Sequence, residues 1–177
     1  MAKPIIFVIM AIPAVLALLI MVPLLTETEI PSAAVNPNDT IHIEYTKHDL
    51  RVISFGVTEK TAAESTEILI IKNDGTAQYN KITEDGGQSQ IMSSISDEKL
   101  RKLTAIIKET GFMSIPKESF PVLEDVTDYT KSTIKITLNG QKSQIFWSDQ
   151  DSTDRLIPPI ITMIESELDE IVKQIIE

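Results

Sequence analysis

Apolar positions along this chain follow three patterns. From Pro4 to Leu25 the sequence is continuously apolar and carries no charged residue. Later, apolar residues alternate with polar ones in several short segments, which is typical of half-buried strands. In two further segments they recur every three or four residues, which is typical of amphipathic helices. The pattern therefore predicts a leading apolar segment followed by a domain of mixed strands and helices.

The first group of strands is predicted between residues 41 and 95. The alternation that begins at Ile41 changes phase after Tyr45, which indicates a bulge or bend near residues 47–49. Residues 68–71 are apolar on both faces, and this favours a central position for their strand. The sequence Asp85-Gly86-Gly87 predicts a turn, followed by a fourth strand at residues 89–95.

A hairpin is predicted around Asn73-Asp74-Gly75. A three-residue loop with its glycine in the left-handed conformation forms a bulge of the G1 type and sets the register. The resulting pairs are Ile71 with Ala77, Leu69 with Tyr79, and Glu67 with Lys81. Two apolar pairs and one opposite-charge pair favour this register over a two-residue loop, which would place Ile68 opposite Lys81.

The second hairpin has the clearest signal in the chain. Residues 131–147 read KSTIKITLNGQKSQIFW, and Asn139-Gly140 is the preferred pair for a type I′ turn. A two-residue loop places Ile134 opposite Ile145 and Ser132 opposite Trp147. Register and buried face are fixed together, because a slip of one residue would turn every side chain to the other face.

Two amphipathic helices are predicted. The first begins at the capping residue Ser96 and ends at Gly111, with Phe112 folding back on the last turn; its apolar stripe is Leu100, Leu103, Ile106 and Ile107. The second begins at Pro158 and Pro159; its stripe is Ile160, Ile164, Leu168, Ile171 and Ile175, and its opposite face carries Glu165, Glu167, Asp169, Glu170 and Lys173. Residues 113–130 predict an ordered surface loop. Together these elements predict an α+β fold, an antiparallel sheet of about five to six strands with both helices packed on one face.

The leading apolar segment predicts one N-terminal transmembrane helix. Its 22 residues, from Pro4 to Leu25, span about 33 Å as a helix, close to the thickness of a hydrocarbon layer. A secretory signal usually has a shorter apolar core, although Ser32-Ala33-Ala34 resembles a cleavage site and leaves that alternative open. Lys3 precedes the run, and Glu27 and Glu29 follow it, which favours a cytoplasmic N-terminus.

This organisation predicts four parts. They are a short cytoplasmic tail at 1–3, a transmembrane anchor at 4–25, a flexible or extended tether at 26–40, and an extracytoplasmic α+β domain at 41–177. The predicted location is a cell membrane crossed once. Within the tether, Asn38-Asp39-Thr40 is a sequon, so Asn38 is a candidate glycosylation site.

Composition narrows the possible functions. The formal net charge is -10, and so acidic a chain repels phosphate backbones, which argues against binding to nucleic acid. There is no cysteine, which excludes disulfides, thiolate catalysis and cysteine-ligated metals. The sequence contains no HExxH, Walker, GxSxG or GxGxxG motif, and no catalytic or cofactor-binding residue is predicted.

Two weak signals for ion binding remain. His42 and His48 are six positions apart and would share one face of an unbroken strand, but no carboxylate forms a recognisable spacing with them, and exposed strand or turn histidines are the preferred interpretation. Asp149, Asp151 and Asp154 alternate in a polar loop and are a candidate site for a calcium-like divalent cation. The glycine and distal glutamate of an EF-hand are absent there.

From Ser65 onward the sequence resembles the uncharacterised DUF6438-type family of secreted or membrane-anchored α+β domains. The matching segments are EILIIKNDGTAQYN, SDEKLRKLTAIIKETGFMSIP and TDYTKSTIKITLNGQKSQIFW, and the resemblance covers roughly residues 65–172. A cysteine-containing segment that often precedes the first hairpin in that family is missing. The resemblance implies the fold and supplies no catalytic residue.

Two functions are compatible with these observations. The first, which we prefer, is a non-enzymatic, membrane-tethered extracytoplasmic domain that binds a protein partner or serves as an accessory subunit of an envelope complex. The second is an ion-dependent sensor or an enzyme that uses the acidic loops.

Overall fold

The computed structural model describes residues 35–55, 58–115 and 120–177, all within one compact unit that spans residues 31–177. The predicted tail, the anchor at 4–25 and most of the tether lie outside the described residues. Among the residues that are described, no helix is both long enough and apolar enough to span a bilayer.

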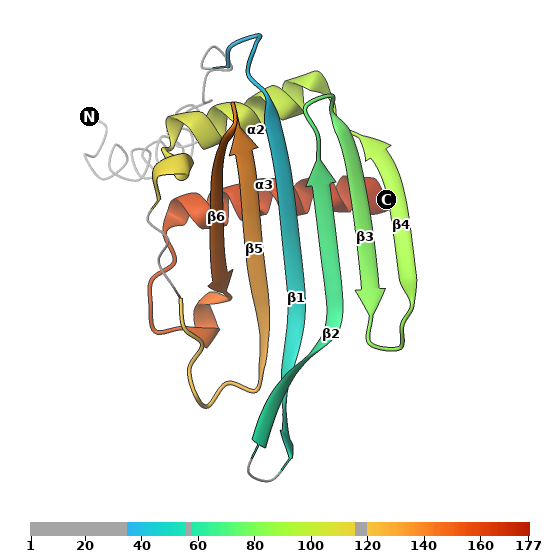
Figure 1. The fold of residues 1–177 in the computed structure, drawn as a ribbon, viewed down its shortest axis with the longest axis vertical. Helices are drawn as coiled ribbons and strands as arrows, with labels where there is room; N and C mark the ends of the chain where they lie inside the picture. The colour runs from blue at the N-terminus through green and yellow to red at the C-terminus, as the bar shows by residue number, and fades with distance from the viewer. Residues whose placement is uncertain (1–34, 56–57, 116–119) are drawn as a thin grey trace, which may run out of the picture. The chain divides into compact units, whose positions relative to one another are not determined.

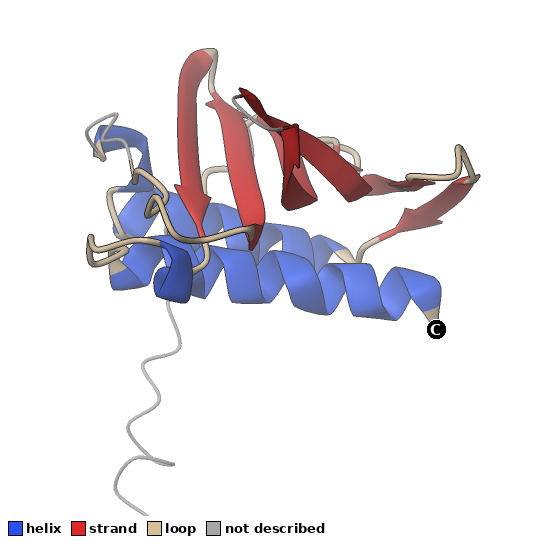
Figure 2. Cartoon of the chain, turned by 90° about the horizontal axis from the view of Figure 1, so that it is seen from below, coloured by secondary structure: helices blue, strands red, loops and turns tan. Residues whose placement is uncertain are grey.

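Six strands form one antiparallel sheet, with the order β4-β3-β2-β1-β5-β6 (Figure 1). The strands are β1 (Ile41–Phe55), β2 (Thr58–Ile71), β3 (Thr76–Thr83), β4 (Gln88–Ser94), β5 (Asp128–Leu138) and β6 (Gln141–Ser148). The helices are α2 (Asp97–Glu109) and α3 (Pro159–Ile176), with short 3-10 turns η2 (Phe112–Ser114) and η3 (Gln150–Ser152). Both α-helices lie on the same face of the sheet, which confirms the predicted α+β arrangement (Figure 2).

Both predicted hairpin registers are confirmed. Leu69 pairs with Tyr79 and Glu67 with Lys81 across β2 and β3, and the loop glycine Gly75 has a φ of 79°. Ser132 pairs with Trp147 across β5 and β6, where Asn139 and Gly140 both have positive φ, as a type I′ turn requires. The turn residues and the cross-strand pairs are therefore sufficient to predict the register of two of the five strand pairings in the sheet.

β1 runs without interruption through the phase change seen in its sequence. A register shift against β2 occurs between Asp49 and Leu50, next to the predicted bulge at 47–49. The strand continues beyond this shift because β1 has a pairing partner on each side. β5 pairs with it as far as Arg51, and β2 pairs with it beyond Arg51. β2 lies between β1 and β3, which confirms its predicted central position.

The core lies between the helix-bearing face of the sheet and the two helices. Its largest fully buried side chains are Phe112, Ile43, Leu69, Ile71, Leu103, Ile107, Ile134, Ile136, Ile145, Ile161, Ile164 and Leu168. In α3 the buried position near the start is Ile161, and Ile160, which the stripe predicted, is only half-buried. The helical period alone does not choose between the two, because at about 100° per residue both lie roughly 50° from the mean direction of Ile164, Leu168 and Ile171.

The end of the predicted tether is fastened to the domain. The Asp39 carboxylate accepts hydrogen bonds from Lys108 Nζ at 2.6 Å, Asn139 Nδ2 at 2.7 Å and the Asn36 amide at 2.7 Å. The Thr40 amide donates to Asn139 Oδ1 at 2.8 Å. The ordered domain therefore begins several residues before the predicted boundary at 41.

This contact has a measurable electrostatic signature. The Asp39 side chain is only 7% exposed, and it forms an ion pair with Lys108. Hydrogen bonds from Lys108, Asn139 and Asn36 lower the pKa of Asp39 to about 2. The charged form of Asp39 is therefore the one that holds the incoming chain against the first helix and the second hairpin.

Candidate functional site

Among the described residues, no helix covers the face of the sheet opposite α2 and α3 (Figure 2). Side chains alternate along each strand, so the neighbours of the core residues point to this face. On β1 they are His42, Glu44, Thr46 and His48, which are all half-buried. Three apolar side chains on this face are exposed: Ile82 of β3, Met92 of β4 and Phe146 of β6. We call this surface the open face.

The two histidines on the open face are held by neighbouring side chains. His42 Nε2 lies 3.2 Å from the Glu44 carboxylate, which also accepts from Lys135 Nζ at 2.8 Å. The hydrogen bond from Lys135, with a smaller one from His42, lowers the pKa of Glu44. These interacting charged side chains of β1 and β5 lie at the centre of the open face.

His48 has a different environment, although it lies on the same strand. Its Nδ1 is 2.9 Å from Thr66 Oγ1, and partial burial, together with the charge of Lys131, lowers its pKa. His48 is therefore neutral near pH 7. Among the described residues, no three histidine, aspartate or glutamate side chains are placed to hold a metal ion, and this includes both histidines.

An apolar groove lies where the open face meets the edge strand β6. Residues 120–122 form one wall, Tyr129 and Lys131 of β5 line its base, and residues 144–148 of β6 complete it. Its volume is about 500 Å³, a size that accommodates one or two large side chains. Phe146, at its centre, remains 46% exposed.

Ser148 and Lys131 are two of the polar residues that line this groove. The Ser148 side chain is 2% exposed, and its hydroxyl has no hydrogen-bond partner among the described residues. Lys131 is the register partner of Ser148, and its ammonium group lies 6.0 Å from the centroid of the Phe146 ring. Since a buried hydroxyl without a partner costs about 1–3 kcal/mol, Ser148 is a place where a ligand acceptor would be stabilising.

A second polar cluster fastens α3 to the sheet. The Glu165 carboxylate accepts hydrogen bonds from Trp147 Nε1 at 3.1 Å, Ser132 Oγ at 3.0 Å and the Tyr45 hydroxyl at 3.3 Å. Asp169, one turn later, accepts from the same hydroxyl at 2.9 Å and from Lys47 Nζ at 2.6 Å. We call this group the α3 clamp.

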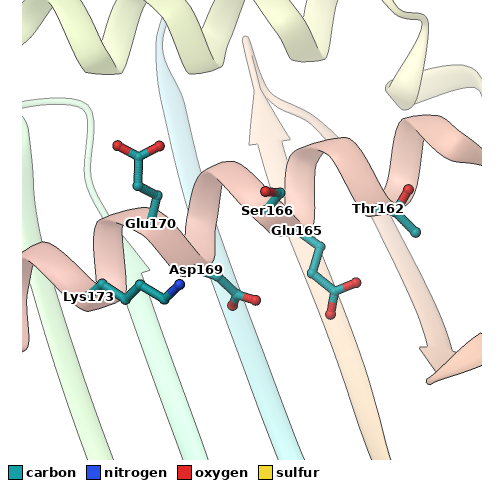
Figure 3. Close-up of a pocket in the computed structure, with 6 residues that line it drawn as sticks. All are labelled: Thr162, Glu165, Ser166, Asp169, Glu170 and Lys173. Carbon is teal, nitrogen blue, oxygen red and sulfur yellow. The ribbon is translucent and has the colours of Figure 1, made fainter.

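The clamp borders a shallow depression of about 380 Å³ along the outer surface of α3 (Figure 3). In this view Glu165 and Asp169 point to one side of the helix, whereas Ser166 and Glu170 point to the other. Burial and the two carboxylates raise the pKa of Tyr45 far above its usual value, so its hydroxyl remains a proton donor. A cluster whose donors and acceptors are matched in this way holds α3 against the sheet.

The clamp corrects one interpretation of the sequence. The sequence placed Glu165 on the face of the second helix opposite its apolar stripe, but Glu165 turns toward the sheet. A usable signal was present: the indole N–H of a buried tryptophan needs an acceptor, and the predicted pairing had placed Ser132 beside Trp147. The sequence did not predict how α3 is rotated about its own axis, which is seen in the burial of Ile161.

The acidic loop that was a candidate cation site has another role. Asp149 accepts from the Thr130 amide at 2.9 Å and from Ser152 Oγ at 2.8 Å, and it therefore closes the end of the second hairpin. Asp151 and Asp154 are exposed, and the three carboxylates are not gathered into a metal-binding group in the described part of the chain. Asn38 lies exposed in the turn at 36–39, and its glycosylation stays a prediction.

No protein-family model matches the chain, and comparison with curated proteins found no match. The resemblance to the DUF6438-type family therefore stays a prediction drawn from its motifs.

Proposed function

We propose that this chain is a membrane-tethered extracytoplasmic domain that binds a protein partner through the open face of its sheet, as an accessory subunit of an envelope complex. The observation that carries the proposal is the asymmetry of the sheet in the described part of the chain: its six strands bear two α-helices on one face and none on the other. Exposed Met92 and Phe146 at opposite ends of the open face give a binding surface apolar contacts.

The charges of the open face suit recognition of a specific partner. Glu44, Lys135 and His42 form a fixed pattern at its centre, flanked by the exposed apolar side chains. Polar groups held in place before binding cost less to order than free ones, and they disfavour partners of the wrong charge. This combination of an apolar rim and an ordered polar centre supports a protein surface as the ligand.

The tether sets the distance at which such a partner would be met. Residues 26–38 separate the apolar segment from the fastened Asp39, and 13 extended residues reach about 45 Å at most. Under this proposal the domain stays close to the bilayer, and its partner is another protein of the same membrane or its surface layer.

Site-specific photo-crosslinking in intact cells tests the proposal. A benzoylphenylalanine replaces Met92, Phe146 or Thr133 of the sheet or, as controls, the exposed α3 residue Thr162 and the exposed α2 residue Arg101. We expect a discrete adduct of constant mass from the sheet positions and none from the helix positions. Adducts from the helix positions alone, or from none of the five, would contradict the proposal.

A further inference from the structure

Within the described part of the chain, no strand pairs with the outer side of β6. β6 is the last strand of the sheet, and among the described strands it pairs with β5 alone. Gln141 and Leu138 flank the two-residue turn, so they exchange hydrogen bonds, and every second pair after them does the same. The backbone groups of the alternate residues Lys142, Gln144, Phe146 and Ser148 therefore point away from β5. No other described residue forms a hydrogen bond with them.

The apolar groove runs beside the second half of this edge. Five consecutive residues, 144–148, line it, although their side chains alternate between the two faces of the sheet. Because their side chains alternate between the two faces, consecutive residues of a strand can border one groove only if that groove lies along the edge of the strand. The free backbone groups of Gln144, Phe146 and Ser148 thus coincide with an apolar recess about 500 Å³ in volume.

The polar groups of the recess identify the chemistry that it would accept. Ser148 contributes a hydroxyl that is buried and unpartnered, and Lys131 makes no ion pair with any described residue. Lys131 and Ser148 are register partners, and both line the recess. A carboxylate satisfies the hydroxyl and the ammonium group together.

We propose that β6 receives an extended segment of the partner protein as a seventh strand. The segment places an apolar side chain against Phe146 and, two residues along on the same face, an acidic side chain near Ser148 and Lys131. This inference rests on the proposed function, because it names the part of the partner that the domain recognises. The recognised motif is apolar-x-acidic in an extended backbone.

A second copy of this chain is a less suitable occupant. Its β6 reads QKSQIFWS, with one lysine and no acidic residue, and would bring no carboxylate to Lys131. The opposite edge of the sheet is also a poorer site. β4 reads QSQIMSS and has no charged residue to select a partner. The unpartnered buried hydroxyl near β4, that of Tyr79 on β3, lies on the helix-bearing face of the sheet.

The test uses the full-length chain in detergent micelles and one defined probe, the peptide Ac-Thr-Thr-Leu-Thr-Glu-Thr-Thr-NH2. Amide hydrogen exchange is measured for β6 and β4, and affinity is measured with a fluorescent label on the peptide. A second peptide carries Lys in place of Glu, and a third has the same side chains with N-methylated backbone. We expect the first peptide to slow exchange at Gln144 and Phe146 while β4 is unchanged, and the N-methylated peptide to have no effect.

Charge reversal makes the assignment specific. Lys131→Glu should weaken binding of the Glu peptide at least tenfold and should allow the Lys peptide to bind. The matched control is Lys142→Glu, which reverses a charge on the same face at the far end of β6 and should change affinity less than twofold. Ser148→Ala should weaken the Glu peptide more than the Lys peptide.

Three results would overturn the inference. They are unchanged exchange at Gln144 and Phe146 with the first peptide, equal binding of the N-methylated peptide, and protection of β6 without peptide in a dimer of the chain. If photo-crosslinks to a partner still form from the sheet positions, the proposed function stands and only the β6 site is lost. If the peptide binds but no partner is crosslinked, the β6 site stands and the proposed function is lost.

Discussion

The two faces of the sheet are formed by the same strands but have different roles. On the helix-bearing face, apolar side chains of β1, β2 and β5 are buried, and Trp147 Nε1 has an acceptor, although the buried Tyr79 hydroxyl has none among the described residues. On the open face, polar and apolar side chains are mixed and only half-buried, and Met92 is 57% exposed. Substitutions on the first face should therefore change stability, whereas substitutions on the second should change binding.

The largest effect is expected in the core beneath α3. Leu168 is fully buried against the sheet, and Leu168→Ala should lower the free energy of unfolding by about 3–4 kcal/mol, through lost burial and a residual cavity. Leu156 lies fully in solvent in the preceding loop, and Leu156→Ala should change it by less than about 0.5 kcal/mol. Urea unfolding followed by the fluorescence of Trp147, the single tryptophan, measures both. Equal effects would contradict the assignment of α3 to the core.

The α3 clamp should give the next largest effect. Glu165→Ala leaves Trp147 Nε1 and Ser132 Oγ without their acceptor and should cost about 2–3 kcal/mol. Glu170, an exposed acid on the same helix, pairs with Lys99, and Glu170→Ala should cost less than about 0.5 kcal/mol. The same urea titration separates the variants, and a loss of less than 1 kcal/mol for Glu165→Ala would show that the clamp is dispensable.

A smaller, pH-dependent effect is expected at Asp39, which holds the segment before β1 against the domain. The pKa of Asp39 is lowered from 3.8 to about 2 in the folded domain, so its contribution is fully present above the higher value. It is lost as the pH falls from about 4 to about 2. Asp39→Asn should therefore lower stability by about 1–2 kcal/mol at pH 7, and the difference from the parent chain should shrink below pH 4.

The control for this prediction is Asp154→Asn, which removes the charge of an exposed loop acid. Its stability should differ from that of the parent chain by less than about 0.5 kcal/mol. Thermal unfolding between pH 2 and pH 7 gives both comparisons. An Asp39→Asn penalty that stays constant across this range would contradict the ion pair with Lys108.

The smallest effect on stability is expected on the open face. Phe146→Ser removes an exposed aromatic ring and should change the free energy of unfolding by less than about 1 kcal/mol. The same substitution should remove most of the peptide affinity of the groove, because it deletes the apolar contact at its centre. Normal affinity in a folded Phe146→Ser chain would place the binding site elsewhere.

The parts of this fold that the sequence predicted are those decided by local chemistry. Asn139-Gly140 and Asp74-Gly75 specify their turns, and each turn then sets which residues face each other across several strand positions. The cap at Ser96 is equally local, since its hydroxyl accepts from the Lys99 amide three residues away. Such signals need no knowledge of the rest of the chain.

The candidate site depends on contacts between distant segments, which is why it was missed. Ser148 is buried and lines a groove together with residues 120–122, which are distant from it in the sequence. Glu165 reaches Tyr45 across 120 positions of sequence, and its direction depends on a rotation of α3 that the apolar stripe left uncertain by one residue. A pattern within one element cannot contain either fact.

Oxidation of two methionines tests the comparison of the two faces most directly. Met92 is 57% exposed on the open face, and Met163 is 37% exposed on α3. The purified full-length chain and intact membranes are treated with the same dose of hydroxyl radicals, and sulfoxide at each residue is measured by mass spectrometry. We predict that both methionines are oxidised in the purified chain and that membranes protect Met92 but not Met163. Equal oxidation of Met92 in the two samples, or protection of Met163 alone, would contradict the assignment of the open face to a partner.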